Sequence, residues 1–87
     1  MTFEIEMHAD AREVLLELDL AIKARILKRM ERMRHELRSR HMMHGIDFFI
    51  AEAGQYRIAY KISGNTKIVF FIGKHKDYED WYEKRRK

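Results

Sequence analysis

The first residues of the chain alternate between apolar and polar side chains. From Thr2 to Met7, Phe3, Ile5 and Met7 are apolar, and the residues between them are acidic. Successive side chains of an extended chain point to opposite faces, so this alternation is typical of a strand with one buried face. We therefore predict a half-buried β-strand over Thr2–Met7.

The apolar spacing then changes to that of helices. Asp10 followed by Glu13 matches a helix N-cap with its reciprocal carboxylate, and the apolar residues that follow predict a short amphipathic helix over Asp10–Leu18. Asp19 is placed to cap a second, longer helix, which would form an antiparallel hairpin with the first. The apolar stripe of this second helix comprises Ile22, Ile26, Met30, Met33 and Leu37, with Leu27 beside it.

The clearest hairpin signal lies in the second half of the chain. Gln55–Ile62 and Lys67–Gly73 are rich in β-branched and aromatic residues and are separated by the turn sequence Ser-Gly-Asn-Thr. The first of these strands alternates, and its Tyr56 and Tyr60 are expected in the core. The second is apolar without a break over Ile68–Ile72, so we expect both its faces to be covered.

The remaining segments complete the element order. Ser39–Gly45 has no period and is predicted to be a loop, whereas Ile46–Glu52 alternates and is predicted to be a strand. Asp77–Arg86 is predicted to be a short helix with Asp77 as its cap. The order β-α-α-β-β-β-α indicates a single α+β domain over residues 1–87. In this domain a helical hairpin packs on one face of a four-stranded, mainly antiparallel sheet, and a short helix ends the chain.

Composition narrows the class of protein. The chain has no cysteine, which rules out disulfides and thiolate metal ligands. Its first residues are polar and acidic, so no signal peptide is predicted. The longest apolar run, Ile68–Ile72, is far shorter than the ~20 residues that cross a bilayer. We expect a soluble, cytoplasmic protein.

Positive charge is concentrated in two segments. The formal net charge is +4, and between positions 23 and 40 only Glu31 and Glu36 oppose the basic residues. These basic residues are Lys23, Arg25, Lys28, Arg29, Arg32, Arg34, Arg38 and Arg40. The chain closes with Lys84-Arg85-Arg86-Lys87. Two basic segments on a small domain indicate an anionic partner, most simply a phosphate backbone. The alternative is a solvated helix face followed by a basic tail.

Two short motifs resemble those of a known family. Gly54-Gln55-Tyr56-Arg57-Ile58-Ala59-Tyr60 is similar to the glycine-x-Tyr-Arg-hydrophobic-x-Tyr pattern of the RelE/ParE toxin superfamily. Phe71-Ile72-Gly73-Lys74-His75-Lys76, followed by aromatic residues, is similar to the end of that family's last strand. With the element order and the basic character, the chain most resembles the RelE-like ribosome-dependent mRNA interferases.

This resemblance implies a function and partners. A RelE-like chain is the toxin of a type II toxin–antitoxin system, and it cleaves mRNA in the ribosomal A site by attack of a ribose 2′-hydroxyl on the adjacent phosphate. The family needs no metal ion and no other cofactor for this reaction. The implied partners are mRNA, the ribosome and an acidic, RelB-like antitoxin.

The resemblance also implies catalytic roles. Arg57 matches the family's mid-strand arginine and is expected to hold the scissile phosphate with its planar guanidinium. His75 is the expected proton-transfer group, because imidazole titrates closest to neutral pH. Lys74 and Lys76 are expected to add positive charge that stabilises the phosphorane.

Aromatic and basic side chains complete the predicted site. Tyr78 or Tyr82 is expected to stack on a base or to act through its hydroxyl. The residues expected to bind RNA or the ribosome are Lys23, Arg25, Lys28, Arg29, Arg32, Lys61 and Trp81.

One departure from the family pattern concerns Ile46–Glu52. Well-studied active members carry lysine or arginine on this strand near the scissile phosphate, whereas here the strand has no basic residue and ends in Glu52. Either His41, His44 or Lys61 takes over this role, or the protein cleaves poorly. The remaining alternative is a ParE-like or degenerate relative that binds without cleaving RNA.

Several of these residues also have a structural interpretation. Arg57 can pair with Glu52 across the hairpin, His75 can be an ordinary exposed histidine at a strand end, and Trp81 can cover the edge of the sheet. The segment His41-Met42-Met43-His44 resembles part of a metal site, but it has no third ligand and its spacing is not diagnostic.

Overall fold

The computed structural model describes residues 2–36, 40–41 and 48–86. Its elements are β1 (Glu4–Met7), α1 (Ala9–Glu17), α2 (Leu20–Met33), β2 (Arg40–His41), β3 (Phe49–Ala53), β4 (Tyr56–Ser63), β5 (Thr66–Lys74) and α3 (His75–Arg86). The predicted α+β order is confirmed with one addition, because β2 is a short strand within the segment predicted to be a loop. No helix of the described chain is long and apolar enough to span a membrane.

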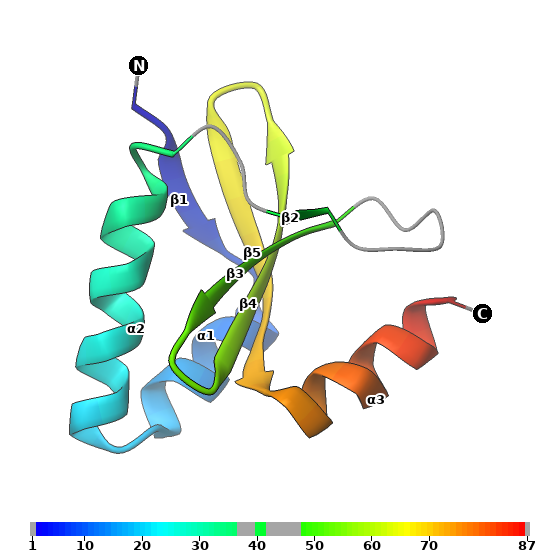
Figure 1. Cartoon of the computed structure of the whole chain (residues 1–87). Helices are drawn as coiled ribbons and strands as arrows, with labels where there is room; N and C mark the ends of the chain where they lie inside the picture. Colours follow the sequence, from blue (N-terminus) through cyan, green and yellow to red (C-terminus); the bar gives the residue numbers. More distant parts are fainter. Residues whose placement is uncertain (1, 37–39, 42–47, 87) are drawn as a thin grey trace.

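The strands form one mixed sheet in the order β1-β5-β4-β3-β2 (Figure 1). β1 runs parallel to β5, and the other neighbours are antiparallel. The predicted four-stranded, mainly antiparallel sheet is therefore confirmed, and the two residues of β2 pair with β3 at its edge. Residues 46–47 of the predicted strand lie outside the described part of the chain, and β3 begins at Phe49.

The helical hairpin of α1 and α2 covers one face of the sheet (Figure 1). Ile26 and Met33 of α2 meet Ile58, Tyr60 and Val69 of the central strands, and all five side chains are fully buried. Burial of an apolar side chain of this size contributes roughly 1.5–3 kcal/mol, so this cluster is the main core of the domain. The predicted burial of Tyr60, and of Tyr56 beside it, is confirmed. Leu37 of the predicted stripe lies outside the described residues.

The starts of the first two helices differ in how well the sequence predicted them. Asp19 caps α2 as predicted, and its Oδ1 accepts a hydrogen bond from the backbone N–H of Ala21 at 3.3 Å. The predicted Asp10 cap of α1 is wrong. His8 is the N-cap, and its Nδ1 accepts from the N–H of Asp10 at 3.3 Å. Asp10 lies instead in the first turn, where the helix dipole favours a negative charge.

A β-bulge explains the uninterrupted apolar run of β5. Ala59 of β4 pairs with Phe71 and Tyr60 pairs with Val69, so Phe70 is an additional residue in the ladder. Val69 and Ile72 pack in the main core, whereas Phe70 and Phe71 both pack on the opposite face of the sheet. The prediction that both faces of this strand are covered is confirmed.

The opposite face of the sheet carries a second apolar cluster. Phe48, Ile50 and Ala59 are its buried centre, and α3 covers them. The residues that pack around this centre are Phe70, Phe71, Tyr78, Trp81 and Tyr82. The α3 helix begins at His75, two residues before the predicted start, and Asp77 lies in its first turn rather than at its cap. The candidate site lies where β5 passes into this helix.

Candidate functional site

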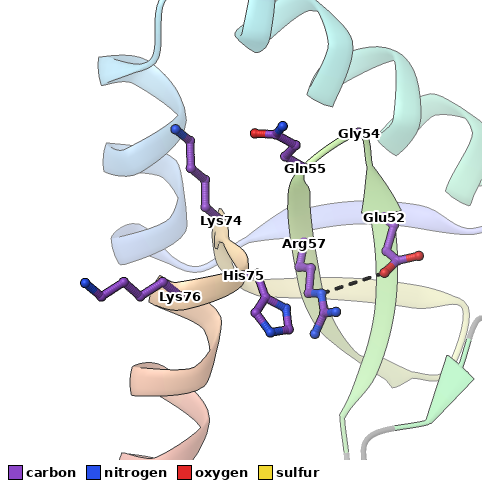
Figure 2. Close-up of a pocket in the computed structure, with 7 residues that line it drawn as sticks. All are labelled: Glu52, Gly54, Gln55, Arg57, Lys74, His75 and Lys76. Atoms are coloured by element: carbon purple, nitrogen blue, oxygen red, sulfur yellow. Dashed lines mark ion pairs between the residues drawn. The ribbon is translucent and has the colours of Figure 1, made fainter.

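The β3–β4 hairpin and the junction of β5 with α3 enclose a cavity of about 390 Å³, called here the hairpin cavity. Four of the predicted catalytic residues line it, as Figure 2 shows. Its lining residues are Glu52, Gly54, Gln55, Arg57, Lys74, His75 and Lys76. The start of β4, with Arg57, and the junction of β5 with α3, with Lys74, His75 and Lys76, thus place basic side chains around a single cavity.

Strand register and two glycines bring these residues together. Gly54 has a φ of +62° in the tight turn between β3 and β4, a conformation that side chains disfavour. Beyond this turn, Arg57 pairs with Glu52 on one side and with Gly73 on the other. A Cβ atom on Gly73 would lie 2.6 Å from Phe71 Cζ and 3.2 Å from Asp77 Cβ. Glycine therefore lets the chain turn into α3 directly beside Arg57.

The guanidinium of Arg57 is held between a carboxylate and an aromatic ring. Its Nε lies 3.7 Å from Oε2 of Glu52 (Figure 2), and its Cζ lies 4.8 Å from the centre of the Tyr78 ring. The Arg57 side chain is 22% exposed. The ion pair considered from the sequence is therefore present, and it lies inside the hairpin cavity. A guanidinium in this position keeps donors available for an anion that enters the cavity.

His75 is the first residue of α3 and points toward Arg57 in Figure 2. Its Nε2 lies 3.0 Å from Oε2 of Glu79, one turn further along the helix, and its ring centre lies 6.4 Å from that of Tyr78. The ends of Lys74 and Lys76 point away from Arg57 in this view. The arrangement therefore has an inner pair, Arg57 and His75, and two outer lysines.

The aromatic residues of α3 all pack against the second apolar cluster, and one of them, Tyr78, also contacts a residue of the cavity. Tyr78 contacts Arg57, and Tyr82 stacks on Tyr78 with ring centres 6.0 Å apart. Trp81 packs against Phe48 and Phe71, with ring centres 5.0 and 5.1 Å away. Trp81 therefore has the packing role considered for it, but it covers the face of the sheet rather than its edge. Tyr78 is the predicted tyrosine that the fold places beside both Arg57 and His75.

Lys61 lies further along the same face of the sheet. Its Nζ is 4.8 Å from the ring centre of Phe48 and 6.0 Å from that of Phe70. It does not line the hairpin cavity. The side chain of His41 and the whole of His44, the other two possible replacements for strand lysines, lie outside what the structure describes. Within the described residues, no three His, Asp or Glu side chains are grouped as metal ligands.

A second, smaller cavity of about 190 Å³ lies between α2 and the β3–β4 turn, and we call it the α2 cavity. It is lined by Arg25, Lys28, Arg29, Arg32, Glu52, Ala53 and Gly54. Glu52 and Gly54 line both cavities. A Cβ on Gly54 would lie 3.0 Å from Nη1 of Arg25, so this glycine also makes room for the arginine over the turn. Lys23, by contrast, donates from Nζ to the carbonyl of Leu16 at 3.2 Å.

Arg29 differs from the other basic residues of α2. Its Nε donates to the backbone carbonyl of Glu52 at 2.9 Å, its Nη1 lies 3.0 Å from Oε1 of Glu36, and its side chain is only 14% exposed. Arg29 thus joins α2 to the end of β3. Sequence spacing grouped it with the solvent-facing cations, because the hairpin that receives it lies more than 20 residues further along the chain.

Comparison with known proteins establishes the fold. No protein-family model matches the chain, and no curated protein matches it in sequence. A double mutant of the E. coli toxin RelE in the free state matches with a TM-score of 0.78 and 16% identity, over 95% of this chain and 94% of that one. A chain of the toxin–antitoxin complex RelBE2 from Mycobacterium tuberculosis matches with a TM-score of 0.77 and 20% identity, over 86% of this chain and 100% of that one.

A third match comes from an archaeon. A chain of the RelE–RelB complex from Pyrococcus horikoshii has a TM-score of 0.67 and 18% identity, over 85% of this chain and 96% of that one. The chain therefore has the RelE toxin fold, and the resemblance inferred from its two short motifs is confirmed at the level of the fold.

Proposed function

We propose that this protein is the toxin of a toxin–antitoxin system and that it cleaves mRNA on the ribosome. The observation that carries this proposal is the hairpin cavity, in which Arg57 and His75 lie together on a RelE fold. A guanidinium and an imidazole are suited to a reaction that moves one proton at each end and gathers negative charge on phosphorus.

The proposed reaction is a transesterification within the RNA. The ribose 2′-hydroxyl loses its proton and attacks the adjacent phosphorus, and the bond to the 5′-oxygen of the next nucleotide breaks. A 2′,3′-cyclic phosphate and a 5′-hydroxyl result, so the atoms balance without water. Arg57 binds the phosphate oxygens, and His75 accepts the proton of the 2′-hydroxyl and passes a proton to the leaving 5′-oxygen. Lys74 and Lys76 attract the RNA to the cavity by their charge.

The α2 cavity supports binding of a long polyanion. Arg25, Lys28 and Arg32 lie beside the turn that also lines the hairpin cavity. RNA that follows the surface from one cavity to the other would meet cations in both. We assign these three residues, with Lys23, to ribosome or RNA binding, which should weaken steeply as salt concentration rises.

A second candidate function is binding without cleavage. The observation that favours it is the Glu52–Arg57 ion pair, which neutralises the main cation of the cavity. In addition, the residues before Glu52 include the buried Phe48, just before β3, and the buried Ile50 within it, where active family members carry basic residues. A protein of this kind would be a ParE-like or degenerate relative that acts on its target by binding.

One experiment separates the two candidates. A defined mRNA is incubated with the protein in a translation extract, in parallel with the same RNA without ribosomes, and cut sites are mapped by primer extension. The nuclease proposal predicts cuts within translated codons and little cutting of free RNA, since ribosomal positioning supplies the orientation that the site alone lacks. The Arg57→Ala variant is the matched negative control. Equal cutting of free RNA, or no cutting in either sample, contradicts the proposal.

We also propose an acidic antitoxin as the partner in the cell. Such a chain would place carboxylates near Arg57, Lys74 and Lys76 and apolar residues near the cluster under α3. Several of the matched structures are complexes of a toxin with its antitoxin, from a bacterium and from archaea, which supports a partner of this kind. Hydrogen exchange on a co-expressed pair tests it. Protection limited to β1, with residues 70–85 exchanging as in the free protein, would place inhibition elsewhere.

A further inference from the structure

The carboxylate of Glu52 lies among basic side chains that could instead bind the phosphate of a ligand. Among the described residues that line the hairpin cavity and the α2 cavity, Glu52 is the only acidic one. The cations around it come from both sides of the turn, and they include Arg57 in one cavity and Arg25 in the other. Glu52 is therefore the described acidic residue that lines both cavities, whereas Glu36 and Glu79 pair with lining residues without lining either cavity themselves.

The fold fixes the backbone of Glu52, whereas about half of its side chain is exposed. Its carbonyl accepts a hydrogen bond from Nε of Arg29 at 2.9 Å, and in the sheet it pairs directly with Arg57. Its side chain is 52% exposed, and the carboxylate reaches Nε of Arg57 at 3.7 Å (Figure 2). The ion pair is made by side chains alone, so its loss requires no change in the pairing of the strands.

The charge of Glu52 opposes the binding of a phosphate. A phosphate that approaches the guanidinium of Arg57 meets a carboxylate already paired with it, and like charges at this range repel. Half-exposed ion pairs are weak, so the carboxylate competes with the phosphate without excluding it. Tyr78, on the other flank of Arg57, keeps the guanidinium in place while the two anions exchange.

We infer that Glu52 is an internal competitor for the phosphate-binding site, and that RNA engages Arg57 only by displacing it. This inference rests on the proposed function, because it concerns regulation of the same site. The competition would make binding depend on how the RNA is presented. RNA free in solution binds weakly, whereas RNA that another particle presents at high local concentration displaces the carboxylate.

The test is a binding measurement on the whole protein. The probe is a fluorescent hexauridylate with 2′-O-methyl riboses, which cannot undergo the proposed cleavage, and its affinity is read by anisotropy at fixed ionic strength. Glu52→Gln keeps the size of the side chain and removes its charge. We expect it to bind the probe about three- to tenfold more tightly than the natural protein, given the weakness of an exposed pair and the relief of repulsion.

Glu31→Gln is the matched control. It makes the same chemical change on α2, where Glu31 pairs with Arg34 outside both cavities. We expect its affinity to stay within about twofold of the natural protein, because exposed charges distant from the site are screened. An equal gain in affinity in Glu31→Gln and Glu52→Gln would show that only the net charge of the protein matters, and it would overturn the inference.

A double variant shows whether the effect passes through Arg57. In the Arg57→Ala background, Glu52→Gln should change affinity for the probe by less than about twofold, because the guanidinium for which carboxylate and phosphate compete is absent. A full gain in that background, a loss of affinity in Glu52→Gln alone, or no detectable binding by either the natural protein or Glu52→Gln would each overturn the inference. Melting temperatures confirm that every variant is folded.

The outcome is independent of the nuclease assay. The probe has no free 2′-hydroxyl, so tighter binding by Glu52→Gln stands even if translated mRNA is not cut. In that case the proposed nuclease fails and the internal competitor remains, as part of a binding site. If mRNA is cut on ribosomes but Glu52→Gln binds the probe no more tightly, the nuclease stands and the competitor fails.

Discussion

The Nζ atom of Lys67 donates hydrogen bonds to the backbone carbonyls of Met33, at 2.7 Å, and Glu36, at 2.6 Å. Lys67 belongs to β5 and is fully buried, while the two carbonyls lie at and just beyond the end of α2. Carbonyls at a helix C-terminus have no partner within the helix and attract a positive charge. The rings of Phe3 and Tyr60 lie 4.6 and 5.2 Å from the same Nζ. A charged side chain therefore joins the sheet to the helical hairpin.

Removing this lysine should destabilise the domain. Lys67→Met keeps an apolar stem of similar length but removes two buried or half-buried hydrogen bonds to carbonyls; the carbonyl of Met33 keeps a bond from the N–H of Glu36 at 3.4 Å. We expect the free energy of unfolding to fall by about 2 kcal/mol, measured by urea denaturation. Lys61→Met is the control, because Lys61 is exposed, and its effect should stay within about 0.5 kcal/mol. Equal stabilities of the two variants would show that the buried bonds contribute nothing net.

The same lysine should make stability depend on alkaline pH. Burial lowers the pKa of Lys67 from its ordinary value of 10.5; the nearby Glu36 carboxylate opposes this shift, and Arg29 adds to it. Between the lowered pKa and 10.5, the unfolded chain still binds a proton that the folded chain has released. The contribution of Lys67 to the free energy of unfolding therefore rises with pH in that window.

The variant Lys67→Met isolates this effect, because it lacks the titrating group and keeps all others. The stability difference between the natural protein and Lys67→Met should be larger at about pH 10 than at about pH 8. Denaturation curves of both proteins at the two pH values give this difference. A difference that stays constant or shrinks with pH would show that the pKa is not lowered by folding.

Arg57→Ala should separate catalysis from stability. Its ion pair with Glu52 is partly exposed, so its loss should cost less than about 1 kcal/mol of unfolding free energy. Loss of a group that stabilises the phosphorane costs about 3 kcal/mol in the barrier, or roughly a hundredfold in rate. The assay is mRNA cleavage in the translation extract, with Arg12→Ala on α1 as an exposed arginine control. A variant that unfolds at working temperature would make Arg57 structural.

His75→Ala should slow cleavage by about a hundredfold and leave ribosome binding nearly unchanged, as expected for loss of a proton-transfer group. Single-turnover rates and co-sedimentation with ribosomes measure the two quantities separately. Glu79→Gln is the companion variant, because Glu79 contacts His75 at 3.0 Å and lies outside the set that lines the cavity. An unaltered rate in His75→Ala would move proton transfer to Tyr78 or to a ribosomal group.

The cations of α2 should divide into two classes. Arg25→Glu with Lys28→Glu should weaken ribosome association and reduce its salt dependence, with little change in melting temperature, because both side chains are exposed. Arg29→Ala should instead lower stability by about 2 kcal/mol, because it breaks the contacts with Glu36 and with the carbonyl of Glu52. Thermal melts and ribosome co-sedimentation distinguish the classes. Identical behaviour of the three sites would contradict this division.

The sequence predicted the parts of the fold that depend on local spacing. Alternation along β4 placed Tyr56 and Tyr60 in the core, and helical spacing placed Ile26 and Met33 there. It could not reveal the roles of Lys67 and Arg29, since both depend on partners more than 20 residues away in the chain. Lys67 lies between a turn and an apolar run, where a lysine at the end of a strand is usually exposed. Its burial depends on the end of α2, whose carbonyls bind its Nζ, and on β1, which pairs with it in the sheet.

The sequence predicted which residues form the candidate site better than it predicted how they are arranged. The family motifs identified Arg57 and His75, and the structure places both on one cavity. The start of α3 was predicted two residues late, because an Asp is the commoner cap and His75-Lys76 reads as the end of a strand. The sequence indicated Glu52 as a possible partner of Arg57. The position of Glu52 between two cavities, however, depends on how α2 packs against the β3–β4 turn.

The bulge at Phe70 also bears on how this protein can change in length. β5 holds one residue more than the ladder with β4 requires, since Ala59 and Tyr60 are adjacent while their partners Phe71 and Val69 are not. The pairing of Arg57 with Gly73 lies beyond this point and does not depend on the extra residue. A deletion or further insertion here would alter how α3 rests on the sheet, yet it would leave the alignment of the cavity residues intact. Length variation is thereby absorbed next to the site without being transmitted to it.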